Sequence, residues 1–185
     1  MGPRFLALST GRAGSRYLAK LLNDVGVPTL HEKHGDLSEW NGSPALGEVS
    51  AWFVTQTEKA PDARVWHFSR HPQPFVTSLV KFGFWGMNHP SIHPYLRRSG
   101  DQIADSFLYW VDWNRRILEV PHPRRTTFRI EGLCSDLLWL LADSVGVDAD
   151  TAGVVPAWNE AQDFAPIPAD VAGEVGGMME VLGYA

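Results

Sequence analysis

The chain has 185 residues, enough for one domain with a substantial hydrophobic core, which we expect to span residues 1–185. Hydrophobic residues make up 44% and charged residues 20%, as in soluble globular proteins, and the formal net charge of −5 argues against a nucleic-acid partner. The single cysteine, Cys134, excludes an internal disulfide. Because the first residues lack a signal-peptide pattern and no apolar run approaches membrane-spanning length, we expect a cytoplasmic protein without a membrane partner.

The chain begins with a short buried strand, expected over residues 4–9, followed by a glycine-rich loop over 9–15 and a helix over 14–26. Apolar residues recur at helical spacing from Tyr17 to Val25, and Gly26 is typical of a helix C-terminus.

The rest of the chain continues the alternation of strands and helices. We expect further strands over 27–31, 64–69 and 126–130, and helices over 48–59, from Pro72 onward, and over 101–119, 133–145 and 169–182. The segments 35–47, 84–100 and 154–168 are typical of loops, and 84–100 is the best candidate for a lid or substrate loop. This order predicts an α/β fold, a three-layer sandwich with a mainly parallel sheet that resembles the P-loop NTPase fold.

The loop Thr10-Gly11-Arg12-Ala13-Gly14-Ser15-Arg16 is expected to bind a phosphate or sulfate group. Its glycines permit a tight turn with inward-facing N–H groups, the following helix adds its positive N-terminus, and Arg12, Ser15 and Arg16 supply side-chain donors. The loop lacks the Lys of the nucleotide P-loop, and the strand ending at Ser69 offers no Asp for a metal ion, so magnesium-dependent phosphoryl transfer has little support. A simple tight turn is the alternative.

A second anion site is indicated by Arg70 and Ser78. Arg70 follows the third expected strand, and Ser78 lies eight residues later on the next helix. A guanidinium and a hydroxyl placed in this way can hold a second phosphate. Alternatively, Arg70 caps a carbonyl group and Ser78 is a surface hydroxyl.

The second strand ends in His31-Glu32-Lys33-His34, which a parallel sheet brings to the same edge as the glycine loop. This segment is one residue short of the HExxH zinc motif, and we expect no metal site.

In their order along the chain, several of these segments resemble the PAPS-dependent sulfotransferase family, especially its short bacterial and carbohydrate-type members. Residues 5–18 resemble the family's 5′-phosphosulfate loop, and residues 66–79 resemble its 3′-phosphate motif. Residues 30–32, 109–114 and 129–133 resemble a His-Glu segment, a YWxxWN helix and an RxEdL strand of its members, and the ending 182–184 is also similar.

The resemblance implies that 3′-phosphoadenosine 5′-phosphosulfate (PAPS) donates a sulfuryl group to a hydroxyl or amine of a small-molecule or carbohydrate acceptor, leaving PAP. It implies that residues 10–16 bind the 5′-phosphosulfate, with Arg12 also catalytic, and that Arg70 and Ser78 bind the 3′-phosphate. Glu32 is the expected general base, with His31 second, although an ion pair of Glu32 with an arginine of the loop is the alternative. A late Arg-Lys-Gly segment found in many eukaryotic members is missing after residue 131. The remaining alternatives are a P-loop small-molecule kinase and a non-catalytic nucleotide-binding module.

Overall fold

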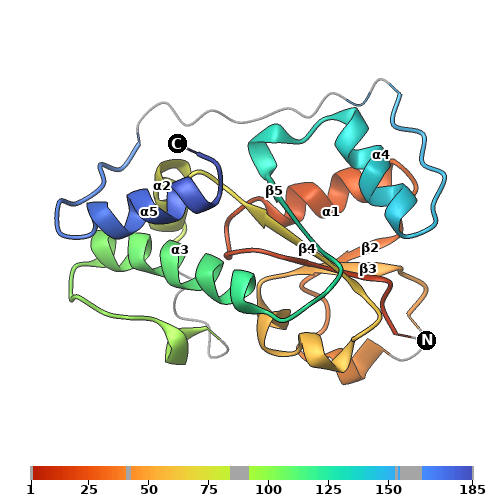
Figure 1. Cartoon of the computed structure of the whole chain (residues 1–185), viewed down its shortest axis with the longest axis horizontal. Coiled ribbons are helices and arrows are strands. Elements are labelled where there is room, and N and C mark those ends of the chain that lie inside the picture. The colour runs from red at the N-terminus through yellow and green to blue at the C-terminus, as the bar shows by residue number, and fades with distance from the viewer. Residues whose placement is uncertain (1, 41–42, 84–91, 153, 155–163, 185) are drawn as a thin grey trace.

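The computed structural model of the chain describes residues 2–40, 43–83, 92–152, 154 and 164–184. In these ranges five strands alternate with helices (Figure 1). The strands are β1 Phe5–Leu8, β2 Thr29–His31, β3 Gly47–Ser50, β4 Arg64–Ser69 and β5 Arg125–Arg129. The α-helices are α1 Ser15–Asp24, α2 Pro72–Lys81, α3 Gln102–Glu119, α4 Ser135–Ser144 and α5 Ala172–Val181. Short 3₁₀ turns, among them Trp52–Thr55 and Ile130–Gly132, join several of these elements.

The five strands form one parallel sheet in the order β2-β3-β1-β4-β5. β1 lies at its centre, where Leu8 is opposite Ser50 of β3 and His67 of β4. All four residues of β1 are buried, as is typical of a central parallel strand covered on both faces. Because the strands run in one direction, the carboxyl ends of β1, β2 and β4 meet at one edge, where open parallel sheets bind ligands.

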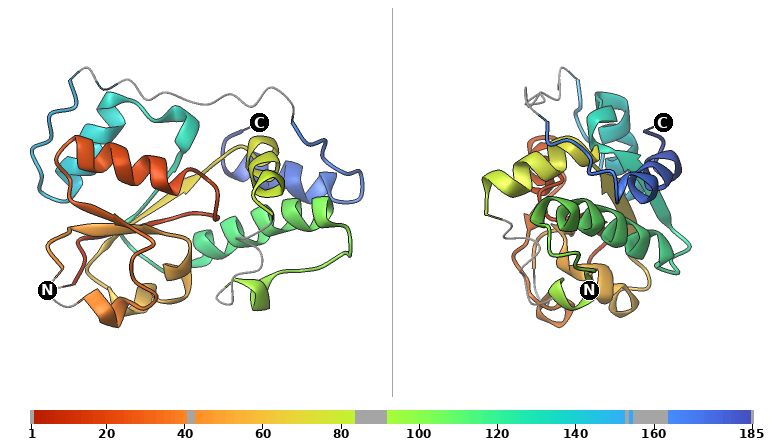
Figure 2. Two further views of the ribbon diagram at one scale, coloured as in Figure 1. Left: turned by 180° about the vertical axis from the view of Figure 1, so that it is seen from behind. Right: turned by 90° about the vertical axis from the view of Figure 1, so that its left-hand side faces the viewer.

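Two hydrophobic cores cover the two faces of the sheet. On β1, Phe5 and Ala7 belong to the core with α1 and α4, whereas Leu6 and Leu8 belong to the core with α2, α3 and α5. This alternation follows from the two-residue period of a strand. Figure 2 shows α1 and α4 together on one side of the sheet and α3 on the other. The predicted three-layer α/β sandwich is therefore confirmed.

The helix predicted over residues 48–59 is wrong. Gly47–Ser50 forms β3, which pairs with β1 on one side and with β2 on the other, and 3₁₀ turns follow it. A Cβ atom on Gly47 would lie 2.5 Å from the ring of Phe5, so the absence of a side chain lets β3 lie against β1. These pairings join residues far apart in the sequence, and local spacing does not reveal them. The sheet consequently has five strands where four were predicted.

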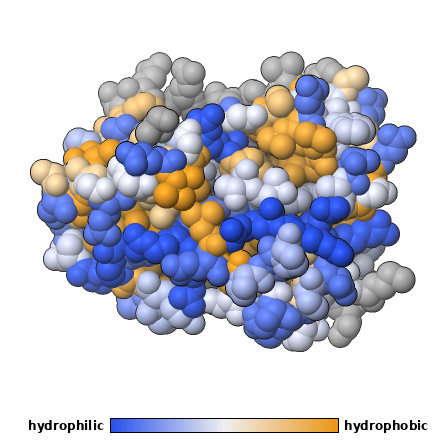
Figure 3. All heavy atoms as spheres, viewed as in Figure 1, coloured by the Kyte–Doolittle hydropathy of each residue, from blue (hydrophilic) through white to orange (hydrophobic). Residues whose placement is uncertain are grey.

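The proposed lid or substrate loop over 84–100 is described in part, since residues 84–91 lie outside the described residues; His93–Tyr95 forms a 3₁₀ turn. None of the helices in the described ranges combines the length and apolar character that crossing a membrane requires. The face seen in Figure 3 is mainly hydrophilic, with separate patches of hydrophobic side chains. Scattered exposed hydrophobic residues of this kind are normal on globular proteins.

Candidate functional site

A cleft of about 700 Å³ opens at the carboxyl-end edge of the sheet, beyond β1, β2 and β4. Most of the residues predicted for the site line it, namely Gly11, Arg12, Gly14, Ser15, Arg16, His31, Glu32, Arg70 and Ser78. Thr10 and Ala13, the other two predicted loop residues, are buried, and the Ala13 N–H donates to the Thr10 carbonyl at 3.1 Å. Tyr17, Lys20 and Phe82 also line the cleft, and none of them was predicted.

The glycine loop turns sharply between β1 and α1. Arg12 has a φ of +77° and Gly14 a φ of +95°, both in the left-handed region. For Arg12 this conformation is strained, and strain of this kind concentrates at functional sites. α1 begins at Ser15, directly after the turn, and its first N–H groups have no acceptor within the helix. The cleft therefore contains a helix N-terminus of the kind that binds anions.

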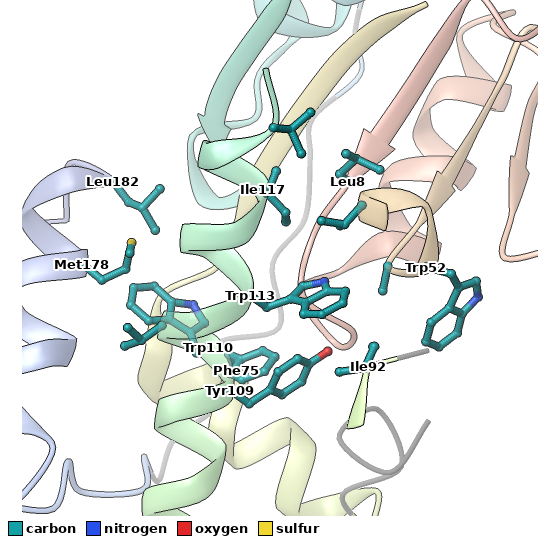
Figure 4. Packing of buried hydrophobic residues seen from close by; sticks show 14 of the residues in the cluster. Leu8, Trp52, Phe75, Ile92, Tyr109, Trp110, Trp113, Ile117, Met178 and Leu182 are labelled. Carbon is teal, nitrogen blue, oxygen red and sulfur yellow. The ribbon is translucent and has the colours of Figure 1, made fainter. Parts of the chain in front are cut away.

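Two loop N–H groups are used inside the protein. The Gly11 N–H donates to the hydroxyl of Tyr109 on α3 at 2.9 Å, and Figure 4 shows this hydroxyl directed at the loop. The Ala13 N–H donates to the Thr10 carbonyl, as described above. The expectation that successive loop N–H groups face the ligand is therefore corrected for Gly11 and Ala13. The start of α1 supplies the backbone donors instead.

Arg12 connects the loop to the two residues predicted for a second phosphate. Its Nη2 lies 3.5 Å from Ser78 Oγ, and its carbonyl oxygen accepts from Arg70 Nη1 at 3.4 Å. Its guanidinium lies 3.8 Å from the ring centre of Phe82, and its buried Nε has no hydrogen-bond partner among the described residues. Burial lowers the pKa of both guanidinium groups, Arg12 and Arg70. Two partly desolvated cations, one with an unused donor, favour an anionic ligand between them.

His31 and Glu32 form the opposite wall. His31 Nε2 lies 2.8 Å from Ser15 Oγ and 3.9 Å from the Glu32 carboxylate. Burial raises the pKa of Glu32, an effect opposed by a hydrogen bond from the Ala51 backbone. Burial, and after it the positive charge of Arg16, lowers the pKa of His31. A carboxyl group with a raised pKa beside an imidazole with a lowered pKa is an arrangement suited to accepting a proton.

Glu48 on β3 holds this wall in place. Its side chain is fully buried, and it accepts hydrogen bonds from the N–H groups of Lys33 at 2.5 Å and His34 at 3.1 Å. Its second oxygen lies 2.6 Å from Nδ1 of His34. Glu32 itself has a φ of +46°, so a strained backbone position sits next to this anchor. No sequence signal marks Glu48 for this role, because its function depends on the pairing of β3.

The cleft carries more positive than negative charge although the whole chain is acidic. Arg12, Arg16, Lys20 and Arg70 line it against Glu32 alone among the acidic residues of the described lining, in a chain of net charge −5. Lys20 was missed, but its position four residues after Arg16 on α1 is a usable sequence signal. Among the residues that the structure describes, no group of three or more His, Cys, Asp or Glu side chains is placed to hold a metal ion. The charge balance indicates an anionic ligand.

The fold is similar to that of a sulfotransferase from Alicyclobacillus acidocaldarius. The comparison covers 99% of this chain and 96% of that chain, with a TM-score of 0.59 and 12% sequence identity. At this identity the likeness shows a shared fold, and it agrees with the predicted fold class. No family model matches the sequence, and no curated protein matches it either.

Proposed function

We propose that this protein is a PAPS-dependent sulfotransferase, which transfers a sulfuryl group to a hydroxyl or amine of a small-molecule or carbohydrate acceptor and leaves PAP. One observation carries the proposal: Arg70 and Ser78 lie within the same cleft as the glycine loop and the start of α1. This gives the cleft two groups of anion donors joined by Arg12. PAPS carries a 5′-phosphosulfate and a 3′-phosphate on one nucleoside. The shared fold with a sulfotransferase supports the same reading.

In this proposal the first anion group binds the 5′-phosphosulfate. The N-terminus of α1, with Gly14, Ser15 and Arg16, surrounds its oxygens, and Arg12 contacts it from the loop. Arg70 and Ser78 bind the 3′-phosphate. The buried Nε of Arg12, which has no partner among the described residues, fits an additional ligand oxygen. Thr10, Gly11 and Ala13 shape the loop through their internal hydrogen bonds, and the cleft remains large enough for part of a nucleotide.

PAPS supplies an activated sulfuryl group attached to a phosphate leaving group. In the transfer a bond forms between the acceptor oxygen and sulfur, the bond from sulfur to the phosphate oxygen breaks, and the acceptor loses its proton. Glu32 accepts that proton in this proposal, because burial makes its carboxylate more basic. His31 is the second candidate, although its hydrogen bond to Ser15 fits better with a role in orienting that hydroxyl. Arg12 and the start of α1 stabilise the negative charge on the leaving group.

The 3′-phosphate assignment is tested by comparing PAP with AMP, which lacks that phosphate. PAP is expected to raise the melting temperature well above the value with AMP at equal concentration, and Arg70→Ala is expected to weaken PAP binding by about tenfold or more. Arg124→Ala is the control, since Arg124 is exposed and contacts the Asp62 carbonyl outside the cleft. Equal stabilisation by AMP and PAP overturns the assignment. Stabilisation by Mg-ATP alone favours a kinase instead.

The base assignment needs turnover, measured as release of PAP in the presence of a panel of acceptors. Glu32→Gln should leave PAP binding intact and remove turnover, because the amide cannot accept the proton. His31→Gln should retain most of the activity. Unchanged turnover in Glu32→Gln would falsify the assignment of Glu32. PAP binding without transfer to any acceptor favours a non-catalytic binding module.

A further inference from the structure

The peptide group between Arg70 and His71 is held at both of its polar atoms. The Arg70 carbonyl oxygen accepts from the indole Nε1 of Trp110 at 2.7 Å, and the His71 N–H donates to Glu131 Oε1 at 2.7 Å. The Trp110 side chain is fully buried on α3, so one of these partners is rigid. Two hydrogen bonds to one peptide plane fix the direction in which the chain leaves β4. They therefore fix where Arg70 enters the cleft.

Glu131 is in turn oriented by Tyr184. The second oxygen of Glu131 accepts from the Tyr184 hydroxyl at 3.0 Å, and that hydroxyl also lies 3.1 Å from Ser69 Oγ. Arg129 donates to the Gly183 carbonyl at 2.6 Å and so anchors the segment that carries Tyr184. These contacts join the ends of β4 and β5 to the segment after α5, which Figure 1 shows returning toward the start of α2.

The tyrosine ring adds packing to the hydrogen bonds. It meets the His71 ring edge-on at 5.4 Å between ring centres, and it lies 6.4 Å from the Trp110 ring. The ring thus packs against His71, which follows the held peptide group, and lies near Trp110, which donates to the carbonyl of that group. Neither Glu131 nor Tyr184 is among the residues that line the cleft, whereas Arg70 is, and the charges of both residues also act on the Arg70 guanidinium.

We propose that Glu131 and Tyr184 are positioning residues that set the preference of the cleft for a 3′-phosphorylated nucleotide by fixing the backbone of Arg70. This inference rests on the proposed function, because it concerns the phosphate assigned to Arg70. The Tyr184 hydroxyl orients the Glu131 carboxyl group, and Glu131 accepts the hydrogen bond of the His71 N–H. The Arg70 guanidinium, placed by this peptide group, contacts the ligand. Loss of the tyrosine hydroxyl alone leaves the ring packing in place.

The test measures the dissociation constants of PAP and AMP by calorimetry for the wild-type protein and its variants. Tyr184→Phe should weaken PAP binding by about threefold to tenfold, the range expected for one hydrogen bond, and leave AMP binding unchanged. Glu131→Ala should have a larger effect of the same kind. Glu131→Gln should restore most of the preference, because its amide oxygen can still accept from the His71 N–H. Tyr95→Phe is the control, since Tyr95 packs on Arg116 away from this cluster.

A double-mutant cycle with Arg70→Ala separates positioning from general stability. If Tyr184 acts through Arg70, Tyr184→Phe should not weaken PAP binding further in the Arg70→Ala background. Equal losses in both backgrounds, or a lower melting temperature with an unchanged ratio of the two dissociation constants, would overturn the inference. A wild-type protein that binds AMP as tightly as PAP would instead overturn the proposed function, so the two failures are distinguishable.

Discussion

Replacement of Glu48 tests whether the wall of the cleft depends on one buried carboxylate. Glu48→Ala removes the acceptor for the Lys33 and His34 N–H groups and for the His34 ring. Hydrogen bonds to a charged group are worth about 1.5–3 kcal/mol each, but water can reach the exposed side of this segment. We therefore expect the free energy of unfolding to fall by about 3–5 kcal/mol, somewhat less than the sum of three such bonds.

Glu48→Gln is the matched conservative change. The amide oxygen can still accept from the two backbone N–H groups, whereas the amide nitrogen replaces the carboxylate oxygen that faces the ring of His34. The expected loss is about 1.5–3 kcal/mol, the value of one hydrogen bond to a charged group. Urea unfolding measures both variants, and Glu58→Gln on the exposed surface controls for a change of net charge.

Two results would refute this reasoning. One is a loss below about 1 kcal/mol for Glu48→Ala, since three hydrogen bonds to a buried carboxyl group cannot be worth so little. The other is equal stability of Glu48→Ala and Glu48→Gln. That result would mean that the hydrogen bonds from the Lys33 and His34 N–H groups contribute nothing to stability. If the wall is held as the structure indicates, turnover should also fall in the order of the stability losses, because Glu32 adjoins the anchored residues.

Three further changes probe the fold around the site. Gly47→Ala should destabilise the protein by about 1–3 kcal/mol, because the new methyl group would meet the Phe5 ring at 2.5 Å; unchanged thermal unfolding would contradict this. Burial lowers the pKa of His67 from 6.5 to about 4 in the folded protein. Between these two pH values the unfolded chain binds a proton that the folded chain does not. The free energy of unfolding therefore falls by about 1.4 kcal/mol for each pH unit of acidification in this range. His67→Gln should flatten that slope in urea titrations by about one proton, and an unchanged slope would refute the assignment. Tyr109→Phe leaves the Gly11 N–H without its acceptor and should cost about 1–3 kcal/mol, whereas a loss below 0.5 kcal/mol would show that the bond is dispensable.

Much of the fold was predictable because its signals are local. The strand, glycine turn and helix at the start of the chain were recognised from spacing and residue type, and the structure places β1, the loop and α1 there. Arg70 and Ser78 were also recognised from their positions around a strand end and a helix, and both line the cleft. The roles assigned to these residues remain predictions.

The missed features all depend on contacts between distant residues. β3 was taken for part of a helix because four residues carry too little periodicity to identify a strand that two neighbours hold in place. Tyr109, whose hydroxyl accepts a hydrogen bond from the Gly11 N–H, lies 98 residues from Gly11 in the sequence. Tyr184 lies 53 residues from Glu131. Spacing along one helix or strand contains no information about such pairs.

The sequence by itself determined the α/β class, the position of the glycine loop and the main charged residues of the cleft, because periodicity and turn chemistry act over a few neighbouring residues. Only the tertiary structure decided that the N–H groups of Gly11 and Ala13 form hydrogen bonds within the protein. It also decided that Glu48 anchors the wall beside Glu32. These assignments depend on which strand pairs with which and which helix packs above them, and that choice is made by burial across the whole chain.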